Sequence, residues 1–343
     1  MDTRKIQQVG GGTYTVSLPK TWAESVDIEP GSVVSLHTHI DGTLVIQTGH
    51  NSDETAAPLT LSVADADMAC IERAIRAAYA AGIGTIQLKN IDSDDEHRHV
   101  ERVARDLTGF TVTESTDLTV RLRSLLDTAE VSITQSVRQL QFAALSAHRD
   151  ATAALLGPET VENPVDRDNQ ADRIFTMVDR YFQRGLDSLH VMDDLGATRS
   201  ELFAYWITAR ELEEIADHAQ RISTVANRLD GPVEDEFAAE LDRMATATQE
   251  MIRDAVAVVL DDEGMSTASD VLTKRDRLRA DTEALDQELF DNEESDYRLT
   301  HALDSFRRTA DNAGTIAELG MRTLVRDGRS TATPISIDGD EDQ

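Results

Sequence analysis

The spacing of hydrophobic residues changes along the chain and divides it into three regions. In the first 48 residues, short alternating runs are separated by turn residues. The runs are Thr13–Leu18, Val33–His37 and Leu44–Gln47, and the turns contain Gly10-Gly11-Gly12, Pro30-Gly31 and Asp41-Gly42. This pattern predicts short strands joined by hairpins. Because so few residues make a marginal core alone, we expect a domain over residues 1–50 that dimerises by intertwining with a second copy.

A small α/β module is predicted over residues 56–116. Strands are expected at Leu59–Val63, Thr85–Leu88 and Phe110–Thr113, and a charged helix over residues 94–107. A further helix, ending near Gly82, is marked by a stripe of buried positions, namely Ile71, Ala74, Ile75, Ala78 and Tyr79.

From Leu118 onward, apolar residues recur at spacings of three and four, which predicts long amphipathic helices. Six helices are predicted, over residues 118–147, 163–190, 198–229, 233–261, 268–292 and 296–326. The helical domain is expected to span residues 118–327, and the polar, acidic segment 328–343 to be a disordered tail.

A repeat is visible inside the helical region. Ala216-Asp217-His218-Ala219 recurs as Ala310-Asp311-Asn312-Ala313, each within the third helix of its half. The predicted fold class is therefore multidomain and mainly α: an N-terminal β-domain, a small α/β module, and a bundle of two three-helix repeats.

Charge adds information about solubility and partners. The chain has 64 acidic and 33 basic residues and a formal net charge of −31, a composition typical of a protein kept soluble in high salt, as in a halophilic archaeon. Residues 1–50 carry three basic and five acidic side chains, a net of −2, which leaves −29 for the rest. Nucleic acid is therefore repelled everywhere except at the N-terminal domain. No apolar run is long enough for a membrane span, so we expect no membrane insertion and a cytoplasmic protein.

Two pairs of carboxylates are candidates for metal binding. Glu213 and Asp217 are four residues apart, as are Asp168 and Asp172, so each pair lies on one helix face. Two such helices packed together could present four hard oxygen ligands to Mg, Mn or Fe, with Zn a further option. Spacing alone equally fits a solvated acidic face. His218 is turned away from Asp217 along the helix and is expected to be a packing or surface residue and not a metal ligand.

Two further observations bear on activity and on DNA. The chain contains no nucleophile elbow, P-loop, dinucleotide motif or paired cysteines, so we expect no enzymatic activity and no organic cofactor. Arg4, Lys5 and Lys20 could form a small basic patch, doubled in a dimer, that contacts the phosphates of duplex DNA. The alternative is an N-terminal domain that serves only for dimerisation.

The N-terminal segment resembles the AbrB/SpoVT swapped-hairpin DNA-binding domain. The resemblance rests on Arg4-Lys5-Ile6, on the run from Gly10 to Trp22 with its Leu18-Pro19-Lys20 step, and on Ile28-Glu29-Pro30-Gly31. It implies an intertwined dimer with a swapped-hairpin β-barrel that binds DNA, with Arg4, Lys5, Thr13 and Lys20 as the candidate contact residues.

The helical region, residues 118–327, looks like the PhoU family, whose two repeats each carry an acidic motif that can bind a metal cluster. Glu213-Glu214-Ile215-Ala216-Asp217 matches that motif, and Asp168-Asn169-Gln170-Ala171-Asp172 fits the partner helix. The resemblance implies a divalent or ferric ion at the first repeat. In the second repeat Arg307 replaces Glu213, and Thr282 replaces Asp168. Metal binding is therefore expected to be asymmetric.

The domain order is similar to that of archaeal PhoU-like regulators of phosphate uptake. It implies a transcriptional regulator that binds operator DNA and senses phosphate status through its bundle. A phosphate transporter ATPase or a signalling protein is a further expected partner. The alternative is an adaptor that restrains a phosphate transporter or its signalling kinase without binding DNA.

Overall fold

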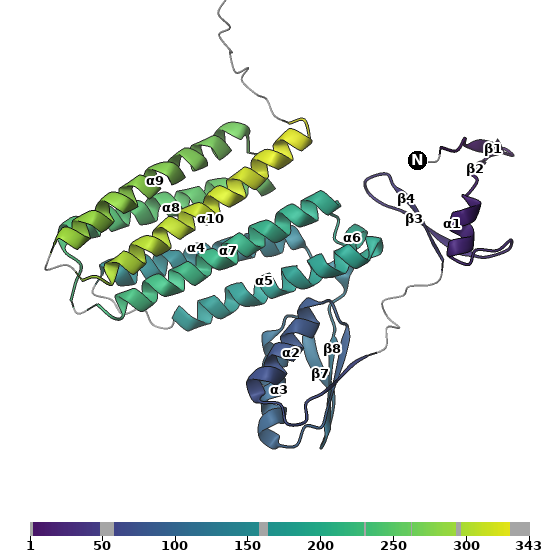
Figure 1. Ribbon diagram of the computed structural model, residues 1–343, viewed down its shortest axis with the longest axis horizontal. Coiled ribbons are helices and arrows are strands. Elements are labelled where there is room, and N and C mark those ends of the chain that lie inside the picture. The colour runs from purple at the N-terminus through teal and green to yellow at the C-terminus, as the bar shows by residue number, and fades with distance from the viewer. Residues whose placement is uncertain are drawn as a thin grey trace, which may run out of the picture. The chain divides into compact units, whose positions relative to one another are not determined.

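The computed structural model describes residues 3–48, 58–157, 164–229, 231–261, 263–292 and 296–329. The predicted disordered tail, residues 328–343, lies outside the described residues from residue 330 onward. Contacts between residues divide the chain into two compact units, Met1–Ala56 and Ala57–Gln343, each of which is drawn in Figure 1 and considered by itself below.

The N-terminal unit consists of two hairpins and a short helix. Its elements are β1 (Gln7–Val9), β2 (Thr13–Thr15), α1 (Lys20–Ser25), β3 (Val34–Thr38) and β4 (Leu44–Thr48). β1 pairs with β2 and β3 with β4, both antiparallel. Gly10 and Gly42 adopt positive φ angles of 66° and 82° in the two turns, a conformation that glycine reaches without strain. In the described part of one chain the hairpins form two separate sheets, and the swapped barrel, which needs a second copy, stays a prediction.

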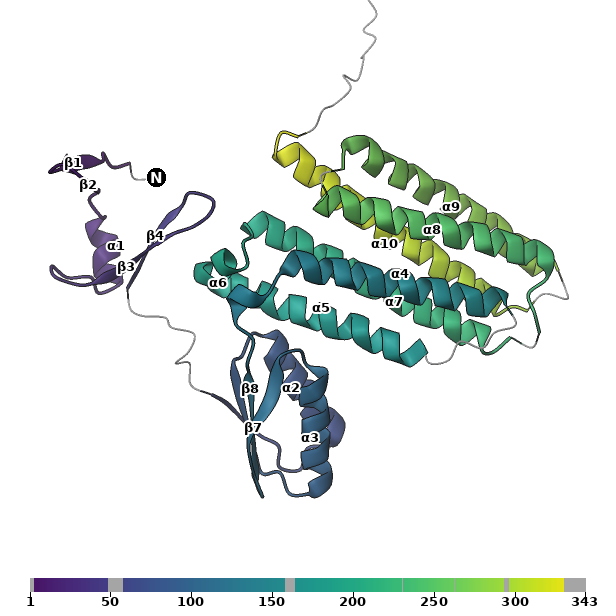
Figure 2. The same ribbon diagram turned by 180° about the vertical axis from the view of Figure 1, so that it is seen from behind.

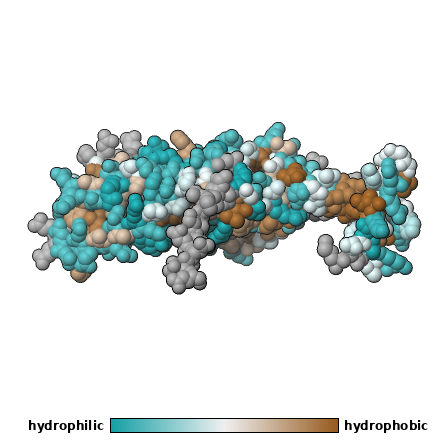
Figure 3. All heavy atoms as spheres, turned by 90° about the horizontal axis from the view of Figure 1, so that it is seen from above, coloured by the Kyte–Doolittle hydropathy of each residue, from teal (hydrophilic) through white to brown (hydrophobic). Residues whose placement is uncertain are grey.

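This unit lacks an apolar core of its own. Among the described side chains of residues 3–46, His39 alone is buried. Large apolar side chains are instead exposed: Ile6, Val9, Tyr14, Val16, Leu18, Val33, Leu36, Ile40 and Leu44. Figure 3 shows apolar side chains gathered on the surface of this unit, at the right of the view. An apolar surface of this extent is a feature of an interaction site.

The second unit begins with the α/β module. Its elements are β5 (Leu59–Ser62), α2 (Met68–Ala80), β6 (Thr85–Lys89), α3 (Asp94–Asp106), β7 (Phe110–Thr116) and β8 (Thr119–Ser124). The sheet has the strand order β5-β6-β8-β7, in which β5 and β6 are parallel and the other pairs antiparallel. Asp67 and Ser93 cap the two helices by accepting hydrogen bonds from the backbone N–H groups of Cys70 and Glu96.

The helix predicted over residues 118–147 is wrong in its first part. Residues 119–124 form β8, and the module extends to Ser124 instead of ending at residue 116. Val120 and Leu122 are buried in the module core, and they alternate with Arg121 and Arg123 on the other face. Buried and exposed residues therefore alternate with the period of two that is typical of a strand, although Leu122 and Leu125 also fit a helical spacing.

Long helices build the rest of the second unit. After the short 3-10 helix η2 (Thr128–Glu130) come α4 (Ile133–Leu156), α5 (Pro164–Asp187), α6 (Leu189–Asp194), α7 (Arg199–Ala226), α8 (Asp235–Leu260), α9 (Met265–Asp291) and α10 (Leu299–Arg326). α4, α5 and α7 pack together, and so do α8, α9 and α10 (Figures 1 and 2). The prediction of two three-helix repeats is confirmed.

The repeats meet through α7 against α10 and α4 against α8, around a shared core with a polar centre. His218 Nε2 lies 3.2 Å from Asn312 Oδ1, and Asn312 donates to Glu211 at 2.6 Å. His218 and Asn312 occupy equivalent positions of the sequence repeat, so the two copies contact each other there. Burial lowers the pKa of His218, which favours the neutral ring. The expected packing role of His218 is confirmed.

The α/β module is attached to the bundle through α5. Arg180 of α5 is 2% exposed and donates from one guanidinium nitrogen to the carbonyls of Tyr79 (2.7 Å) and Ile83 (3.0 Å). Its guanidinium also lies over the rings of Tyr79 and Phe110, 4.8 and 5.4 Å from their centres. An ion pair between Arg173 and Asp106 adds a second link. These contacts place α2 beside α5, as Figures 1 and 2 both show.

None of the described helices is long and apolar enough to cross a membrane.

Candidate metal centre

Three of the four predicted metal ligands come together between α5 and α7. Asp172 of α5 and Glu213 and Asp217 of α7 each offer a carboxylate oxygen, and these oxygens lie within 4.8 Å of one another. We call these residues the carboxylate triad. The side chain of Asp168, on the same helix as Asp172, falls outside the described residues. Within the described part of the chain, no other group of three acidic, histidine or cysteine side chains has this geometry.

Packing of the two helices creates the triad. Leu212, Ile215 and Ala216 on α7 are buried in the bundle core, and Ala171 on α5 is buried beside Asp172. Glu213 and Asp217 are one helical turn apart at the border of that buried face, so they turn toward α5. The helix contact between α5 and α7 then brings Asp172 opposite them.

Burial and mutual repulsion raise the pKa values of two members of the triad. Burial, followed by the charges of Asp217 and Asp172, raises the pKa of Glu213 to about 7. Burial and Asp217 also raise the pKa of Asp172, while Arg76 and a hydrogen bond with Glu213 lower it. Carboxylates that repel one another hold a proton at neutral pH unless a cation replaces it.

These residues fit a metal ion. Several half-buried carboxylate oxygens converge on one point, and their shared charge favours an added cation. Such oxygen donors suit Mg, Mn or ferric iron better than soft metals. A bound ion would supply positive charge that holds α5 and α7 together.

In the second repeat, two arginine side chains bind the carboxylate that corresponds to Asp217. Asp311, the counterpart of Asp217, accepts hydrogen bonds from Arg279 at 2.7 Å and from Arg307 at 3.4 Å. The Thr282 hydroxyl, at the position of Asp168, is buried and donates within its own helix to Leu278 at 2.7 Å. Two guanidinium groups therefore balance this carboxylate, which agrees with the expected asymmetry. Metal occupancy at either repeat stays a prediction.

Two arginines that the sequence analysis did not select belong to this region. Arg76 of the α/β module acts electrostatically on Asp172, and Arg180 fixes that module to α5. Sequence spacing contains no signal for either residue, because both act between elements that are far apart in the chain.

The four candidate DNA-contacting residues are all exposed. Arg4 and Lys5 precede β1, Thr13 opens β2, and Lys20 opens α1. Lys20 forms an ion pair with Glu24 at 3.5 Å, which reduces its free charge. Contact with DNA by any of them stays a prediction.

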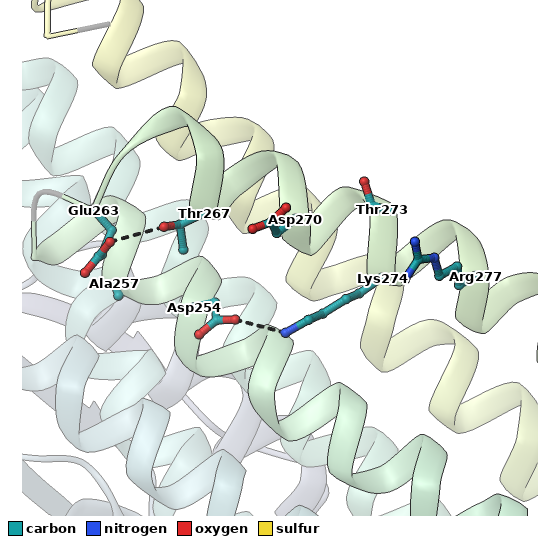
Figure 4. Close-up of a pocket in the computed structure, with 8 residues that line it drawn as sticks. All are labelled: Asp254, Ala257, Glu263, Thr267, Asp270, Thr273, Lys274 and Arg277. Carbon is teal, nitrogen blue, oxygen red and sulfur yellow. Dashed lines mark hydrogen bonds and ion pairs between the residues drawn. The ribbon is translucent and has the colours of Figure 1, made fainter. Parts of the chain in front are cut away.

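An open hollow of about 480 Å³ lies between α8 and α9 (Figure 4). Lys274 reaches across it to Asp254 at 3.3 Å, and Thr267 donates to Glu263 at 3.1 Å. Asp270 and Arg277 also line it. Three carboxylates (Asp254, Glu263 and Asp270) and two cations (Lys274 and Arg277) line it, so the hollow favours neither an anion nor a metal ion.

Models of known families match the N-terminal unit and part of the helical bundle. Residues 137–226 match the PhoU domain. The matched segment runs from α4 to the end of α7 and contains the whole carboxylate triad. Residues 7–52 match the family described as antidote-toxin recognition MazE, bacterial antitoxin. The chain thus combines a MazE/AbrB-like N-terminal domain with a PhoU domain.

Two solved structures of PhoU proteins align with part of this chain. The crystal structure of PhoU from Pseudomonas aeruginosa aligns with 18% identity and a TM-score of 0.44, covering 57% of this chain and 96% of that one. The phosphate transport system regulatory protein PhoU from Streptococcus pneumoniae aligns with 18% identity and a TM-score of 0.40, covering 57% and 94%. A comparison with curated protein sequences gave no match.

Proposed function

We propose that this chain is a phosphate-homeostasis regulator that dimerises and binds duplex DNA through its N-terminal unit, while its PhoU bundle senses phosphate status. The observation that carries the proposal is the joining of two parts in one chain. A PhoU-type repeat assembles the carboxylate triad, and a MazE/AbrB-like unit leaves its apolar side chains uncovered.

Electrostatics supports the assignment of DNA binding to the N-terminal unit. Residues outside the first 50 carry a net charge of −29, against −2 inside them. A phosphate backbone is repelled by the former and tolerated by the latter. Arg4, Lys5 and Lys20 supply the positive charge there, and Thr13 offers a hydroxyl on the neighbouring strand.

The bundle is proposed to bind a divalent or ferric ion through Asp172, Glu213 and Asp217, with Asp168 as a fourth ligand. A transporter ATPase or a signalling protein is its proposed partner. The match of residues 137–226 to the PhoU domain supports this choice of partner. We propose no enzymatic activity for the chain.

A charge placed in the uncovered apolar surface is expected to break the dimer. Leu36 lies in β3, opposite Ile46, and is 65% exposed in the single chain. In Leu36→Asp, the mass measured by light scattering is expected to fall to that of a monomer, because a carboxylate would be buried at the interface. Ser35→Asp, which adds the same charge to the adjacent exposed position, serves as control. A Leu36→Asp protein that remains dimeric would contradict dimerisation through this surface.

Removal of the basic residues is expected to abolish DNA binding. Chromatin immunoprecipitation with the wild-type protein should enrich phosphate-transport promoters, with enrichment that depends on phosphate supply. The Arg4/Lys5/Lys20 triple-alanine variant should lose that enrichment, since each lost contact also reduces counter-ion release. A variant lacking Arg253, Arg277 and Arg322, which are exposed on the bundle, should retain it. Absence of enrichment by the wild-type protein would favour the adaptor function instead.

A further inference from the structure

The sheet of the α/β module is covered by helices on one face only. Ile86 and Leu88 of β6 and Val120 and Leu122 of β8 are buried in a core that they share with residues of α2 and α3. Figures 1 and 2 both show these two helices on the same side of the sheet. Among the described residues, no helix outside the module contacts the strands extensively. The opposite face of the sheet is therefore open.

The open face is polar and positively charged. Side chains alternate along a strand, so the residues between the buried ones point to this face. Its basic residues are Lys89 of β6 and Arg121 and Arg123 of β8, and Glu114 of β7 is the one acidic residue in the four strands as the structure describes them. Three basic residues and one acidic residue give the face a formal charge of +2. The other outward positions carry hydroxyls or an amide, namely Thr60, Ser62, Thr85, Gln87, Thr111, Thr116 and Thr119.

The strand register places the three cations next to one another. Lys89 lies opposite Thr119, two residues from Arg121, so Lys89 and Arg121 are diagonal neighbours about 7–8 Å apart. Arg123 follows Arg121 on the same strand at about 7 Å. Arg121 forms an ion pair with Glu114 at 2.9 Å. Lys89 and Arg123 are exposed and form no ion pair within the described part of the chain, so their charges are available to an anionic ligand.

The module also escapes most of the acidic excess of the chain. Residues 58–124 contain 11 acidic and 8 basic residues, a net of −3, which is close to the −2 of residues 1–50. Residues 125–343 contain 46 acidic and 22 basic residues, a net of −24. Repulsion of nucleic acid beyond residue 50 therefore comes mainly from the bundle. Inside the module, five of the acidic residues lie in α3, on the covered side of the sheet.

We propose that the open face of this sheet is a second DNA-contacting surface, which binds the phosphate backbone of duplex DNA. This inference rests on the DNA binding proposed above. Cations and hydroxyls are the groups that bind phosphate oxygens. The aromatic residue of these strands, Phe110, is buried, so the face offers no platform on which unpaired bases could stack. Duplex DNA therefore fits the face better than a single strand does.

The expected role of this face is to add affinity without adding sequence specificity. The module follows the N-terminal unit after nine residues of sequence, 49–57. A duplex bound by one part of the chain is thus presented to the other at a high effective concentration. Contacts to the phosphate backbone carry no direct sequence information. The face should strengthen binding to every duplex by the same factor and leave the choice of operator to the N-terminal unit.

Fluorescence anisotropy of the full chain with two labelled duplexes, at a series of KCl concentrations, tests the proposal. One duplex carries a promoter enriched by the wild-type protein, and the other is a shuffled sequence of the same length. The Lys89/Arg121/Arg123 triple-alanine variant should bind both about tenfold more weakly, and the slope of log K against log salt should decrease by about 1 for each lost phosphate contact. The ratio of the two affinities should stay at the wild-type value.

The Arg73/Arg98/Arg105 triple-alanine variant is the matched control. These three arginines are exposed on α2 and α3, on the covered side of the sheet. Their removal changes the net charge of the chain by the same amount, so this variant should keep the wild-type salt slope and affinity if the position of the charges decides binding.

Glu114→Gln gives a test in the opposite direction. It removes the acidic residue of the open face and releases Arg121 from its ion pair. It should therefore bind both duplexes about threefold more tightly than the wild type. A gain of affinity cannot result from a folding defect, so this variant keeps the test valid if the triple-alanine protein is unstable.

The outcomes separate this inference from the function on which it depends. If the wild type binds neither duplex, the proposed DNA binding fails and the second surface fails with it. If the wild type binds DNA, but the Lys89/Arg121/Arg123 variant and Glu114→Gln both keep its affinity and salt slope, DNA binding stands and the open face takes no part in it. Equal weakening of the Lys89/Arg121/Arg123 variant and its matched control would also overturn the inference, because net charge alone would then explain the loss.

Discussion

Arg180→Ala is expected to lower the free energy of unfolding of the α/β module by about 3–5 kcal/mol. The substitution removes two charge-assisted hydrogen bonds to the carbonyls of Tyr79 and Ile83 and leaves both acceptors facing a cavity. It also removes the cation stacked on two aromatic rings. Hydrogen exchange resolved by segment should show global loss of protection in the module, while the bundle keeps most of its own.

Arg173→Ala is the control variant for Arg180→Ala. Arg173 also joins α5 to the module, through Asp106, but the two side chains are 47% and 34% exposed. An ion pair this accessible to water contributes at most about 1 kcal/mol. The two substitutions remove the same formal charge from the same helix, so a similar loss of stability in both would show that burial of Arg180 is not what holds the module.

The sequence predicted the elements more reliably than their ends. Alternation and turn residues located the β3–β4 hairpin but not strand β1 (Gln7–Val9), and the three- and four-residue spacing located the bundle helices. The region from Leu118 to Leu126 was assigned to a helix because its leucines fit both periods. Pairing with β6 and with the neighbouring β7 decides in favour of a strand, because the strand preference of a segment depends on the partners it packs against.

For the candidate site, too, the sequence predicted the spacing within single helices but not the contacts between elements. Spacing alone places Glu213 and Asp217 on one face of α7 and Asp168 and Asp172 on one face of α5, and the family resemblance pairs the two helices. The structure brings these three together. It also adds Arg180 and Arg173 of α5, which bind the α/β module through Tyr79, Ile83 and Asp106. A contact between domains of this kind cannot be predicted from helix periodicity.

Glu213→Gln is expected to stabilise the metal-free protein at alkaline pH. The folded-state pKa of Glu213, about 7, exceeds the ordinary value of 4.5, so the folded protein binds this proton more tightly than the unfolded chain. Stability therefore falls as pH rises from about 4.5 to 7, and the full penalty is present above pH 7. A fully buried group with this shift would lose about 3 kcal/mol, which partial exposure reduces to about 1–2 kcal/mol. Chemical denaturation of both proteins at pH 8 and pH 4.5, with a chelator present, should show the gain at the higher pH only.

A bound metal ion should reverse the sign of the stability difference between Glu213→Gln and the wild type. In saturating Mn²⁺ the wild-type carboxylate becomes a ligand, so the wild type should become more stable than Glu213→Gln at pH 8. Asp311→Asn is the control in the second repeat: it removes the partner of Arg279 and Arg307, so it should destabilise the protein with or without metal. A Glu213→Gln protein that is less stable than the wild type in chelator would mean that the Glu213 carboxylate stabilises the metal-free fold, and it would contradict the expected repulsion within the triad.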